Sequence, residues 1–268
     1  MTEPGAPVKL SILMPVKCEG AQLPVILKIL SAVVELPHEI LVVYDDEDDD
    51  SIPAVHALQD RHPQVRLVHN RLGRGVANAI RAGVREAAGE YVLIFAVDDT
   101  GPALAIDDML LLMDRGCDLV SCTRYARGGR RLGGSFIGGV LSWLANGLFQ
   151  RLSGSVLSDG TTGIKMIRRS IFEQVSLEAS VGWAVAFELA IKVQLAGFRV
   201  GEVPIISIDR LFGGQSTFRL GPWLMEYWKW FVWGLKEMRR APGRARQVMT
   251  VADVMEPSDL TPVRHVPS

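Results

Sequence analysis

Two groups of carboxylates stand directly after apolar runs of the sequence. Residues 45–50 read Asp-Asp-Glu-Asp-Asp-Asp, and Asp98 and Asp99 follow the apolar run Tyr91–Val97. Carboxylates there can accept from a nucleobase or ribose, or hold Mg²⁺ or Mn²⁺ against a diphosphate. The alternatives are a solvated acidic turn at 45–50 and, for Asp98 and Asp99, a cap for a helix that begins near Pro102. The occurrence of two acidic turns in one predicted sheet favours a binding site.

A basic, glycine-rich segment is the second candidate for chemistry. Residues 124–131 contain four arginines, among them Arg124 and Arg127, and two glycines. Arginine binds phosphate through paired hydrogen bonds, and glycine lets the backbone come close to an anion. The segment is therefore a candidate anion site, with an ordinary solvated loop as the alternative. Asp209 and Arg210, with the glycines after them, form a second loop that could close over a ligand.

Alternating strands and helices must position these residues. Apolar runs predict strands at 9–16, 39–44, 65–69 and 91–97, and helical periodicity predicts helices at 21–34, 52–61 and 75–88. This alternation indicates an α/β fold with a mostly parallel sheet and helices on both faces. Ligands of such sheets bind at the carboxyl ends of the strands, where both acidic turns lie.

The second half of the chain is less regular. It predicts strands at 118–122, 164–167 and 198–206, and helices within 135–152, at 184–196 and at 222–240. Glu188 stands on an otherwise apolar helix, which favours a structural pairing with an arginine over a role in the site.

The helix at 222–240 is amphipathic and rich in tryptophan. Four of the chain's six tryptophans lie between residues 223 and 233, beside a polar stripe that includes Glu226 and Lys229. Indole rings favour the membrane interface, and the arginines that follow would attract anionic lipid. We expect a helix that lies in a membrane surface, with a core helix of a homo-oligomer as the alternative. Neither 132–150 nor 220–235 is predicted to span a bilayer.

Composition limits the remaining classes of function. With 48% hydrophobic and 22% charged residues the chain is not intrinsically disordered, and its net charge of -1 predicts no nucleic-acid partner. The three cysteines have no metal-binding spacing, which predicts a reducing, cytoplasmic compartment. Residues 1–9 contain no apolar stretch typical of a secretory signal.

These segments, in this order, resemble the family-two glycosyltransferases, specifically the dolichyl-phosphate mannose synthase-like branch with the GT-A fold. The resemblance runs from about Leu10 to Leu220. The segments that carry it are Ile12–Val16 with Glu19, Glu39–Asp46, Gly73–Gly83, Ser121–Tyr125, Asp159–Lys165, Glu202–Ile205 and Asp209–Ser216. The implied organisation is a GT-A catalytic domain at 1–220, an interfacial helix at 221–240 and a disordered tail at 241–268.

The resemblance implies a role for each candidate residue on the donor side. Pro15 and Glu19 would border the base pocket, and Asp45 or Asp46 would hold the nucleoside. The turn at Asp98, with Asp99 beside it, would bind Mg²⁺ or Mn²⁺ and with it the diphosphate.

On the acceptor side, Arg124 would bind the lipid phosphate together with Arg127 and Ser142. Arg210 would close over the site from its loop. Asp159 would orient the acceptor or the metal, and would act as a base only toward a hydroxyl acceptor.

The implied reaction is transfer of mannose or glucose, from GDP-mannose or UDP-glucose, to a dolichyl or undecaprenyl phosphate with inversion. The enzyme would be attached peripherally to the cytoplasmic face of a membrane. Three departures leave alternatives open: Ala96 stands at the first aspartate of the family's D-x-D motif, Gly138 at an arginine, and Thr217-Phe218 at a lysine. The alternatives are a transferase acting on a glycan or small-molecule hydroxyl, and a degenerate relative that only binds nucleotide sugars.

Overall fold

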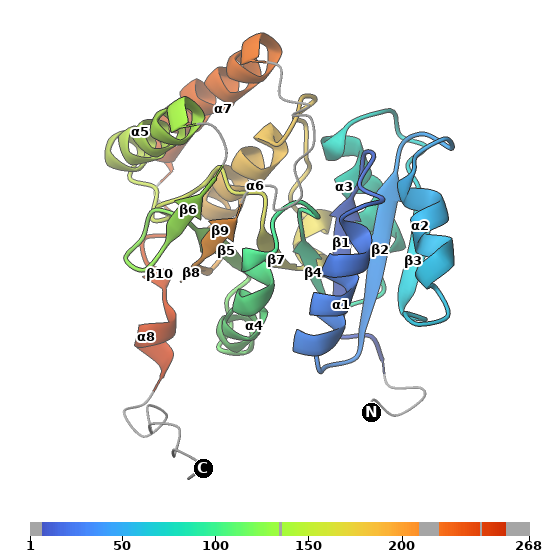
Figure 1. The fold of residues 1–268 in the computed structure, drawn as a ribbon. Coiled ribbons are helices and arrows are strands. Elements are labelled where there is room, and N and C mark those ends of the chain that lie inside the picture. The colour runs from blue at the N-terminus through green and yellow to red at the C-terminus, as the bar shows by residue number, and fades with distance from the viewer. Residues whose placement is uncertain (1–6, 134–135, 209–219, 242, 256–268) are drawn as a thin grey trace.

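The computed structural model describes residues 7–133, 136–208, 220–241 and 243–255. Its first half alternates strictly between strands and helices (Figure 1). The elements are β1 (Leu10–Pro15), α1 (Leu23–Val33), β2 (His38–Tyr44), α2 (Ser51–Leu58), β3 (Val65–His69), α3 (Val76–Glu86) and β4 (Tyr91–Ile94). Each lies within about two or three residues of its predicted position, because long apolar runs and clear helical periodicity specify these elements locally.

The second half combines the sheet with shorter elements. It contains η1 (Gly101–Ala105), α4 (Ile106–Asp114), β5 (Leu119–Thr123), β6 (Arg130–Leu132), α5 (Phe136–Ser153), β7 (Lys165–Arg168), η2 (Arg169–Glu173), α6 (Ala184–Leu195), β8 (Val200–Pro204), β9 (Ile206–Ile208), α7 (Leu220–Arg240), β10 (Val248–Met249) and α8 (Val251–Val254). The single strand predicted at 198–206 is divided: β8 stays in the central sheet and β9 pairs with β6.

The central sheet has eight strands in the order β10-β8-β5-β7-β4-β1-β2-β3. Strand β7 runs antiparallel to both of its neighbours, β4 and β5, and the other neighbouring pairs are parallel. Helices cover both faces, as the alternation predicts. The side chains of β1 and β2 are buried on both faces, which explains their continuous apolar sequence.

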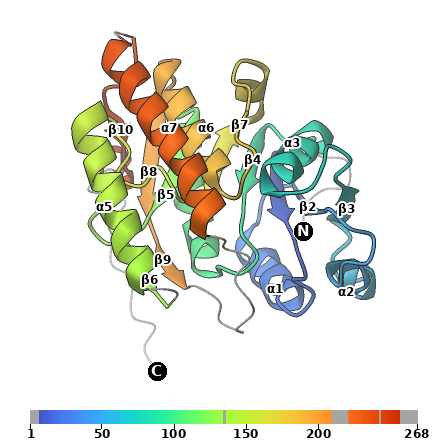
Figure 2. The same ribbon diagram turned by 90° about the horizontal axis from the view of Figure 1, so that it is seen from above.

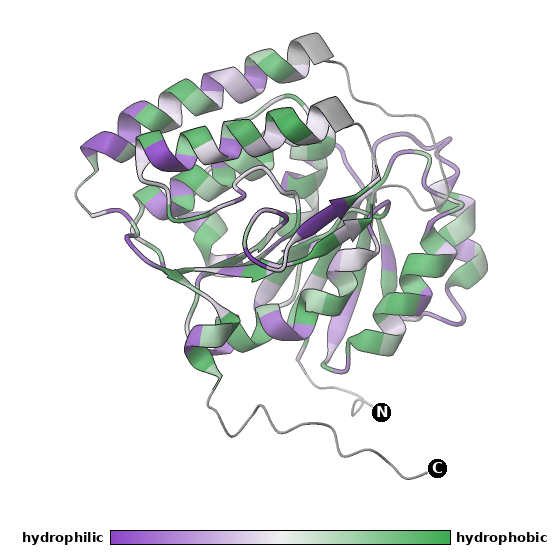
Figure 3. Cartoon of the chain, turned by 60° about the vertical axis from the view of Figure 1, so that its left-hand side comes forward, coloured by the Kyte–Doolittle hydropathy of each residue, from purple (hydrophilic) through white to green (hydrophobic). Residues whose placement is uncertain are grey.

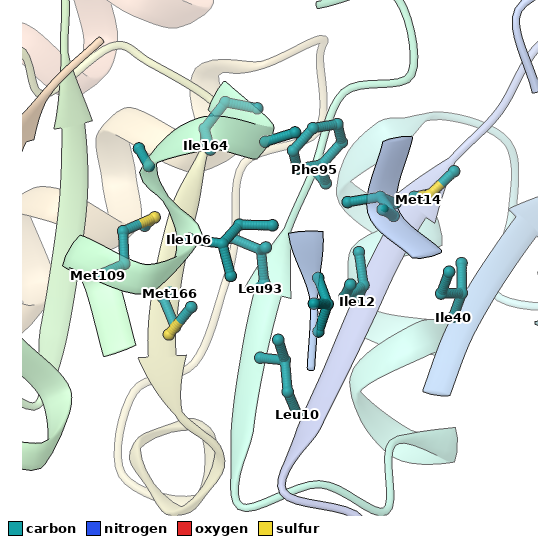
Figure 4. Close-up of a cluster of buried hydrophobic side chains, with 14 of the residues drawn as sticks. Leu10, Ile12, Met14, Ile40, Leu93, Phe95, Ile106, Met109, Ile164 and Met166 are labelled. Carbon is teal, nitrogen blue, oxygen red and sulfur yellow. The ribbon is translucent and has the colours of Figure 1, made fainter. Parts of the chain in front are cut away.

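Two apolar cores lie on opposite faces of the sheet. One face packs against α1 and α4, and Figure 4 shows part of this core, with Ile12 and Leu93 on the sheet and Ile106 and Met109 on α4. The other face packs against α3 and α6. Helices α5 and α7 form a further layer over α6, lying side by side (Figure 2). Phe149 of α5 meets Phe187 of α6 and Phe231 of α7 edge to face.

The prediction of a disordered tail is wrong for residues 243–255. Strand β10 pairs in parallel with β8 and forms the edge of the central sheet. Helix α8 then contacts α4. The strand is two residues long and only half-buried, so no periodic pattern marks it in the sequence.

Candidate active site

The candidate residues gather at the carboxyl edge of the central sheet. Strand β1 ends at Pro15, β2 is followed by Asp45, and β4 leads to Asp98. These three strands are parallel neighbours, so their ends lie together. Arg124 follows β5, which is separated from β4 only by β7. The topology therefore places the predicted donor and acceptor residues along one edge.

On the predicted donor side, Asp45 organises the turn that opens α3. Its two carboxylate oxygens accept from Asn70 Nδ2 and from the Gly75 amide, each over 2.7 Å. Asn70 Nδ2 also donates to the Gly73 carbonyl, and Gly73 and Gly75 both have positive φ, of 103° and 112°. Only glycine adopts such a conformation readily, which explains the two glycines of this segment. Asp46 forms an ion pair with Arg74 at the surface.

Later acids of the run hold the loop after β1. Asp49 is buried and accepts from the amides of Cys18 and Ser51, while Asp50 accepts from the Gly20 amide. The Ser51 hydroxyl accepts from the Glu19 amide. Part of the acidic run therefore fixes the backbone at the predicted base pocket, instead of lying in solvent.

The predicted metal pair, Asp98 and Asp99, fits a shared ion poorly. The Asp99 carboxylate accepts from the Ser207 hydroxyl over 2.6 Å and from the Ile208 amide over 2.9 Å, both on β9. It also accepts from the Gly101 amide over 3.3 Å, at the first residue of η1, although the residue at the N-cap position of η1 is Thr100. In the described part of the chain, no three His, Cys, Asp or Glu side chains are grouped so that they could bind a metal. Asp98 remains a predicted ligand.

On the predicted acceptor side, Arg124 and Asp159 form a buried ion pair. Arg124 Nε donates to Asp159 Oδ2 over 2.7 Å, and a terminal nitrogen donates to Oδ1 over 3.0 Å. The Asp159 side chain is fully buried and the Arg124 side chain is 16% exposed. Burial alone would raise the pKa of Asp159, but the charge and hydrogen bonds of Arg124 outweigh it and hold that pKa below its ordinary value.

This pairing changes what Asp159 can do. A carboxylate already engaged by a guanidinium is a weak base, so it suits positioning of Arg124 better than proton abstraction. The Arg124 guanidinium lies over the aromatic ring of Tyr125, with the guanidinium carbon 5.1 Å from the ring centroid. The Tyr125 hydroxyl is buried and has no hydrogen-bond partner in the described structure.

A second buried carboxylate, Glu202 of β8, supports the Asp159 segment. Its oxygens accept from the Ser158 amide over 2.7 Å, the Ser158 hydroxyl over 2.9 Å and the Asp159 amide over 3.1 Å. Burial raises the pKa of Glu202 to about 7, although these hydrogen bonds oppose the change. The Ser158 hydroxyl also bonds Thr123, the residue before Arg124.

Lys165 is a further buried charge near the same segment. Its ammonium donates to the Ser121 hydroxyl over 2.9 Å and to the Thr162 carbonyl over 2.8 Å. Burial lowers the pKa of Lys165 to about 8. It therefore joins β7 to β5 beneath the Arg124–Asp159 pair.

Helices α5 and α7 lie directly over this pair. Thr161 bonds both Arg124 and Asp159, and Asn146 of α5 donates to the Thr161 hydroxyl over 2.8 Å. The hydroxyl of Ser142, one helical turn before Asn146, lies 3.3 Å from the Thr161 hydroxyl. Tyr227 of α7 is close enough for the charges of Arg124 and Asp159 to act on its hydroxyl, whose pKa burial raises.

The outer surface of these two helices is apolar. We call it the α5–α7 face, and its exposed members are Val140, Leu141, Trp143, Leu144, Leu148 and Leu152 on α5, and Leu224, Met225, Trp228 and Val232 on α7. Hydrophobic residues are spread along both helices in Figure 3. None of the helices, over the residues described, is long and apolar enough to cross a bilayer.

The tryptophan-rich helix differs in detail from the prediction. Trp228 is 65% exposed, but Trp230 is 3% exposed and packs into the core. Tyr227 turns inward to the arginine site. The apolar face is completed by α5, whose glycines and polar residues hide its amphipathic pattern in the sequence.

The structure brings some predicted residues together and not others. Arg124, Asp159 and Ser142 share one cluster, whereas Arg127 is exposed on the basic segment. Arg210 lies outside the described residues. Glu188 is structural, as expected, but its partner is Lys192 at 2.8 Å instead of an arginine.

Sequence reasoning assigned no role to Asn146, Glu202 or Lys165. A signal for Glu202 was present, because it is a charge inside an apolar strand, whereas Lys165 is the first residue of its strand. Asn146 gave no such signal.

Comparisons with known proteins show the family of the chain. The model of the family described as glycosyl transferase family 2 matches residues 11–176. Dolichol-phosphate mannosyltransferase of Pyrococcus furiosus is 25% identical over 223 residues, covering 82% of this chain and 62% of that protein. Undecaprenyl-phosphate 4-deoxy-4-formamido-L-arabinose transferase of Yersinia enterocolitica is 28% identical over 170 residues, covering 62% and 50%. The chain thus spans between half and two thirds of the length of these relatives.

Among solved structures, glucosyl-3-phosphoglycerate synthase of Mycobacterium tuberculosis has a similar fold. Its complex with Mn²⁺, UDP-glucose and phosphoglyceric acid has a TM-score of 0.64 at 18% identity, covering 88% of this chain and 86% of that one. The same protein has been solved with Mg²⁺ and UDP. This likeness confirms the predicted fold class.

Proposed function

Because the chain belongs to glycosyl transferase family 2, we propose that it transfers a hexose from a nucleotide sugar to a polyprenyl phosphate. The observation that carries this proposal is the position of the α5–α7 face. The two helices that carry this exposed apolar surface also bring Asn146 and Tyr227 to the buried Arg124–Asp159 cluster, so a phosphate held at Arg124 could have its hydrocarbon chain at a membrane.

The donor would lie at the ends of β1, β2 and β4. Pro15, Glu19 and the acidic turn at Asp45 and Asp46 border this part of the sheet edge, and Asp98 would face the diphosphate. Mg²⁺ or Mn²⁺ stays the predicted cofactor, with Asp98 as its predicted ligand. GDP-mannose and UDP-glucose are both candidate donors.

The acceptor phosphate would bind at Arg124. The bonds to Asp159 use Nε and one terminal nitrogen of the guanidinium, which fixes its plane and leaves the other terminal nitrogen to meet a phosphate oxygen. Ser142 is bonded to the same cluster through Thr161. Arg127, exposed on the neighbouring loop, would add positive charge, and Arg210 stays a predicted contributor.

The proposed chemistry is one in-line displacement. An acceptor phosphate oxygen forms the new bond to the anomeric carbon as the bond to the donor's diphosphate breaks, and the nucleoside diphosphate leaves with that electron pair. A phosphate monoester has a second pKa near 6 and is largely ionised at neutral pH, so no general base is needed. The engagement of Asp159 by Arg124 is consistent with this, because the site then needs positioning more than proton transfer.

The α5–α7 face would attach the protein to the membrane, whose cytoplasmic surface is the predicted location. Its two exposed tryptophans, Trp143 and Trp228, are typical of groups that settle at the bilayer interface. Arg151 near the end of α5 and Arg239 and Arg240 at the end of α7 would meet anionic headgroups.

Two measurements test the proposal in sequence. Thermal shifts with GDP, UDP and their hexose conjugates, with and without Mn²⁺, should identify one nucleotide, since saturating ligand stabilises by about 3 kcal/mol at roughly 100 times its dissociation constant. Transfer from that donor should then proceed to polyprenyl phosphate in vesicles and not to 3-phosphoglycerate or glycan hydroxyls. Transfer to a hydroxyl acceptor alone would overturn the lipid acceptor. A nucleotide shift without transfer to any acceptor would favour a degenerate relative that only binds nucleotide sugars, and absence of any nucleotide shift would overturn the proposed function.

A matched pair of variants isolates the apolar face. Trp143→Glu/Trp228→Glu should abolish transfer to polyprenyl phosphate in vesicles while leaving the nucleotide shift intact. Leu104→Glu, which changes a leucine that is 78% exposed on η1, should leave both unchanged. Equal loss of transfer in both proteins would show that acidic substitutions act in a general way.

A further inference from the structure

The turn after β4 is tied to β9 by a carboxylate. The Ser207 hydroxyl and the Ile208 amide, both on β9, donate to the two oxygens of Asp99 over 2.6 and 2.9 Å. The Gly101 amide donates to the same carboxylate at the start of η1. Ser207 is buried, so these bonds are shielded from water and are worth more than surface bonds.

Close backbone contact reinforces the junction. A Cβ atom at Gly101 would lie 1.8 Å from the Ile206 carbonyl oxygen and 2.9 Å from the carbonyl carbon. The neighbour is main chain and cannot rotate away, so any larger residue at position 101 must push β9 from the turn.

Strand β9 continues this junction to the acceptor side. It pairs with β6, and the Arg130 amide donates to the Ile205 carbonyl over 2.8 Å. The Ile205 amide donates to the Thr123 carbonyl over 2.9 Å, immediately before Arg124. The segment of Arg124 is therefore bonded at both of its ends to the chain that enters and forms β9.

We propose that Asp99 is a positioning residue that holds β9, and with it the Arg124 segment, at a fixed place relative to the turn of Asp98. Its carboxylate serves as a structural bridge between the donor and acceptor sides, and not as a second ligand of a metal. What the two sides bind rests on the proposed function, but the bridge itself can be tested without it.

Four variants separate a bridge from a metal ligand. Asp99→Asn keeps an oxygen for the two amides, and its NH₂ can donate to the Ser207 hydroxyl oxygen, so it preserves the bridge while removing the charge. Asp99→Ala removes the bridge. Gly101→Ala disturbs the same contact without touching a carboxylate, and Ser207→Ala is a mild variant that removes one bond.

Hydrogen–deuterium exchange of β9 and β6 gives the first readout. We expect Asp99→Ala and Gly101→Ala to speed exchange of the Ile208 amide by about tenfold or more, as the loss of a charge-assisted bond implies. Asp99→Asn should stay near the wild-type rate, and Ser207→Ala should lie between. Unchanged exchange in both Asp99→Ala and Gly101→Ala would overturn the bridge.

Nucleotide binding and turnover give the second readout. Asp99→Asn should retain the Mn²⁺-dependent thermal shift and rescue most of the kcat that Asp99→Ala loses, with KM for the donor little changed. Loss of the metal-dependent shift in Asp99→Asn, with wild-type exchange at β9, would identify Asp99 as a ligand and refute the proposal. If the wild-type protein gives no shift with any nucleotide, the proposed function fails, while the exchange data still decide the bridge.

Discussion

At the scale of single residues, the predicted acceptor side depends on ionisable side chains that are buried and hydrogen-bonded. Asp159, Glu202 and Lys165 lie beneath Arg124, each with at least two hydrogen bonds. Burying a charge is costly unless it is paired, so such a cluster is maintained only where the geometry is well satisfied. Its consequence is that the Arg124 guanidinium is fixed in the absence of any substrate.

Breaking the Arg124–Asp159 pair should destabilise the fold. Asp159→Ala leaves a buried guanidinium without its partner, and we expect the free energy of unfolding to fall by about 3–5 kcal/mol, measured by urea denaturation. The exposed Arg127→Ala in the same segment is the control and should stay within about 0.5 kcal/mol of wild type. A loss below about 1 kcal/mol in Asp159→Ala would mean that water replaces the pair.

Glu202 should give stability a distinct pH dependence. Its pKa rises from 4.5 to about 7 on folding, so between these values the folded state holds a proton that the unfolded chain releases. Wild-type stability should therefore fall as pH rises through this window, whereas Glu202→Gln cannot lose a proton there. The stability of Glu202→Gln relative to wild type should increase by roughly 3 kcal/mol at most between about pH 4.5 and 7.

The comparison of the two proteins isolates Glu202. Asp159, with a lowered pKa, loses its stabilising effect at more acidic pH, and Lys165 titrates above about pH 8, so both lie outside the window. Parallel stability curves for the two proteins from pH 4.5 to 7 would contradict the raised pKa.

At the scale of secondary structure, two helical glycines have different surroundings: Gly83 of α3 is buried and Gly147 of α5 is exposed. Helix α3 lies so close to the sheet that a Cβ at Gly83 would be 2.4 Å from Leu13 Cδ1 and 2.6 Å from Leu13 Cγ. A Cβ at Gly147 in α5 would meet nothing within 4 Å. The same substitution should thus have opposite effects in the two helices.

We expect Gly83→Ala to lower the free energy of unfolding by about 1–3 kcal/mol, because it overpacks α3 against β1. Gly147→Ala should raise it by about 0.5–1 kcal/mol, because alanine favours a helix and has room there. Thermal unfolding of both proteins checks the pair, and stabilisation by Gly83→Ala would show that α3 can move away from the sheet.

At the scale of the whole molecule, the distribution of apolar surface matters more than the net charge. The chain carries a net charge of only -1, so attraction to anionic lipid must come from local arginines such as Arg239 and Arg240. The α5–α7 face supplies the apolar contact beside them. Membrane attachment by this route should combine a salt-sensitive and a salt-insensitive part.

Vesicle flotation tests that combination. Raising the ionic strength from about 0.1 M to about 1 M shortens the Debye length from about 10 Å to about 3 Å, and should weaken binding to anionic vesicles without abolishing it. Neutral vesicles should bind less protein and show little salt dependence. Complete release at high salt would mean that charge alone attaches the protein and that the apolar face does not insert.

Much of the first half of the molecule follows from local sequence. Strands such as β2 and β3 and helices such as α1 have patterns that specify them without help from distant residues, and their alternation specifies a mostly parallel sheet. The position of the acidic turns at the carboxyl ends of β2 and β4 follows from the same pattern. The basic segment also singled out Arg124, and the resemblance to the family singled out Asp159.

How these residues are used depends on contacts that form only in the folded chain. Asp159 pairs with Arg124 from 35 positions away, and Asp99 bonds Ser207 from 108 positions away, so no local pattern contains either contact. The division between β8 and β9, the placement of β10 and the joining of α5 and α7 into one apolar face depend equally on distant partners. Sequence periodicity indicates which side of a helix or strand is buried. The partner of a charged side chain depends instead on which distant chain segments come together when the protein folds.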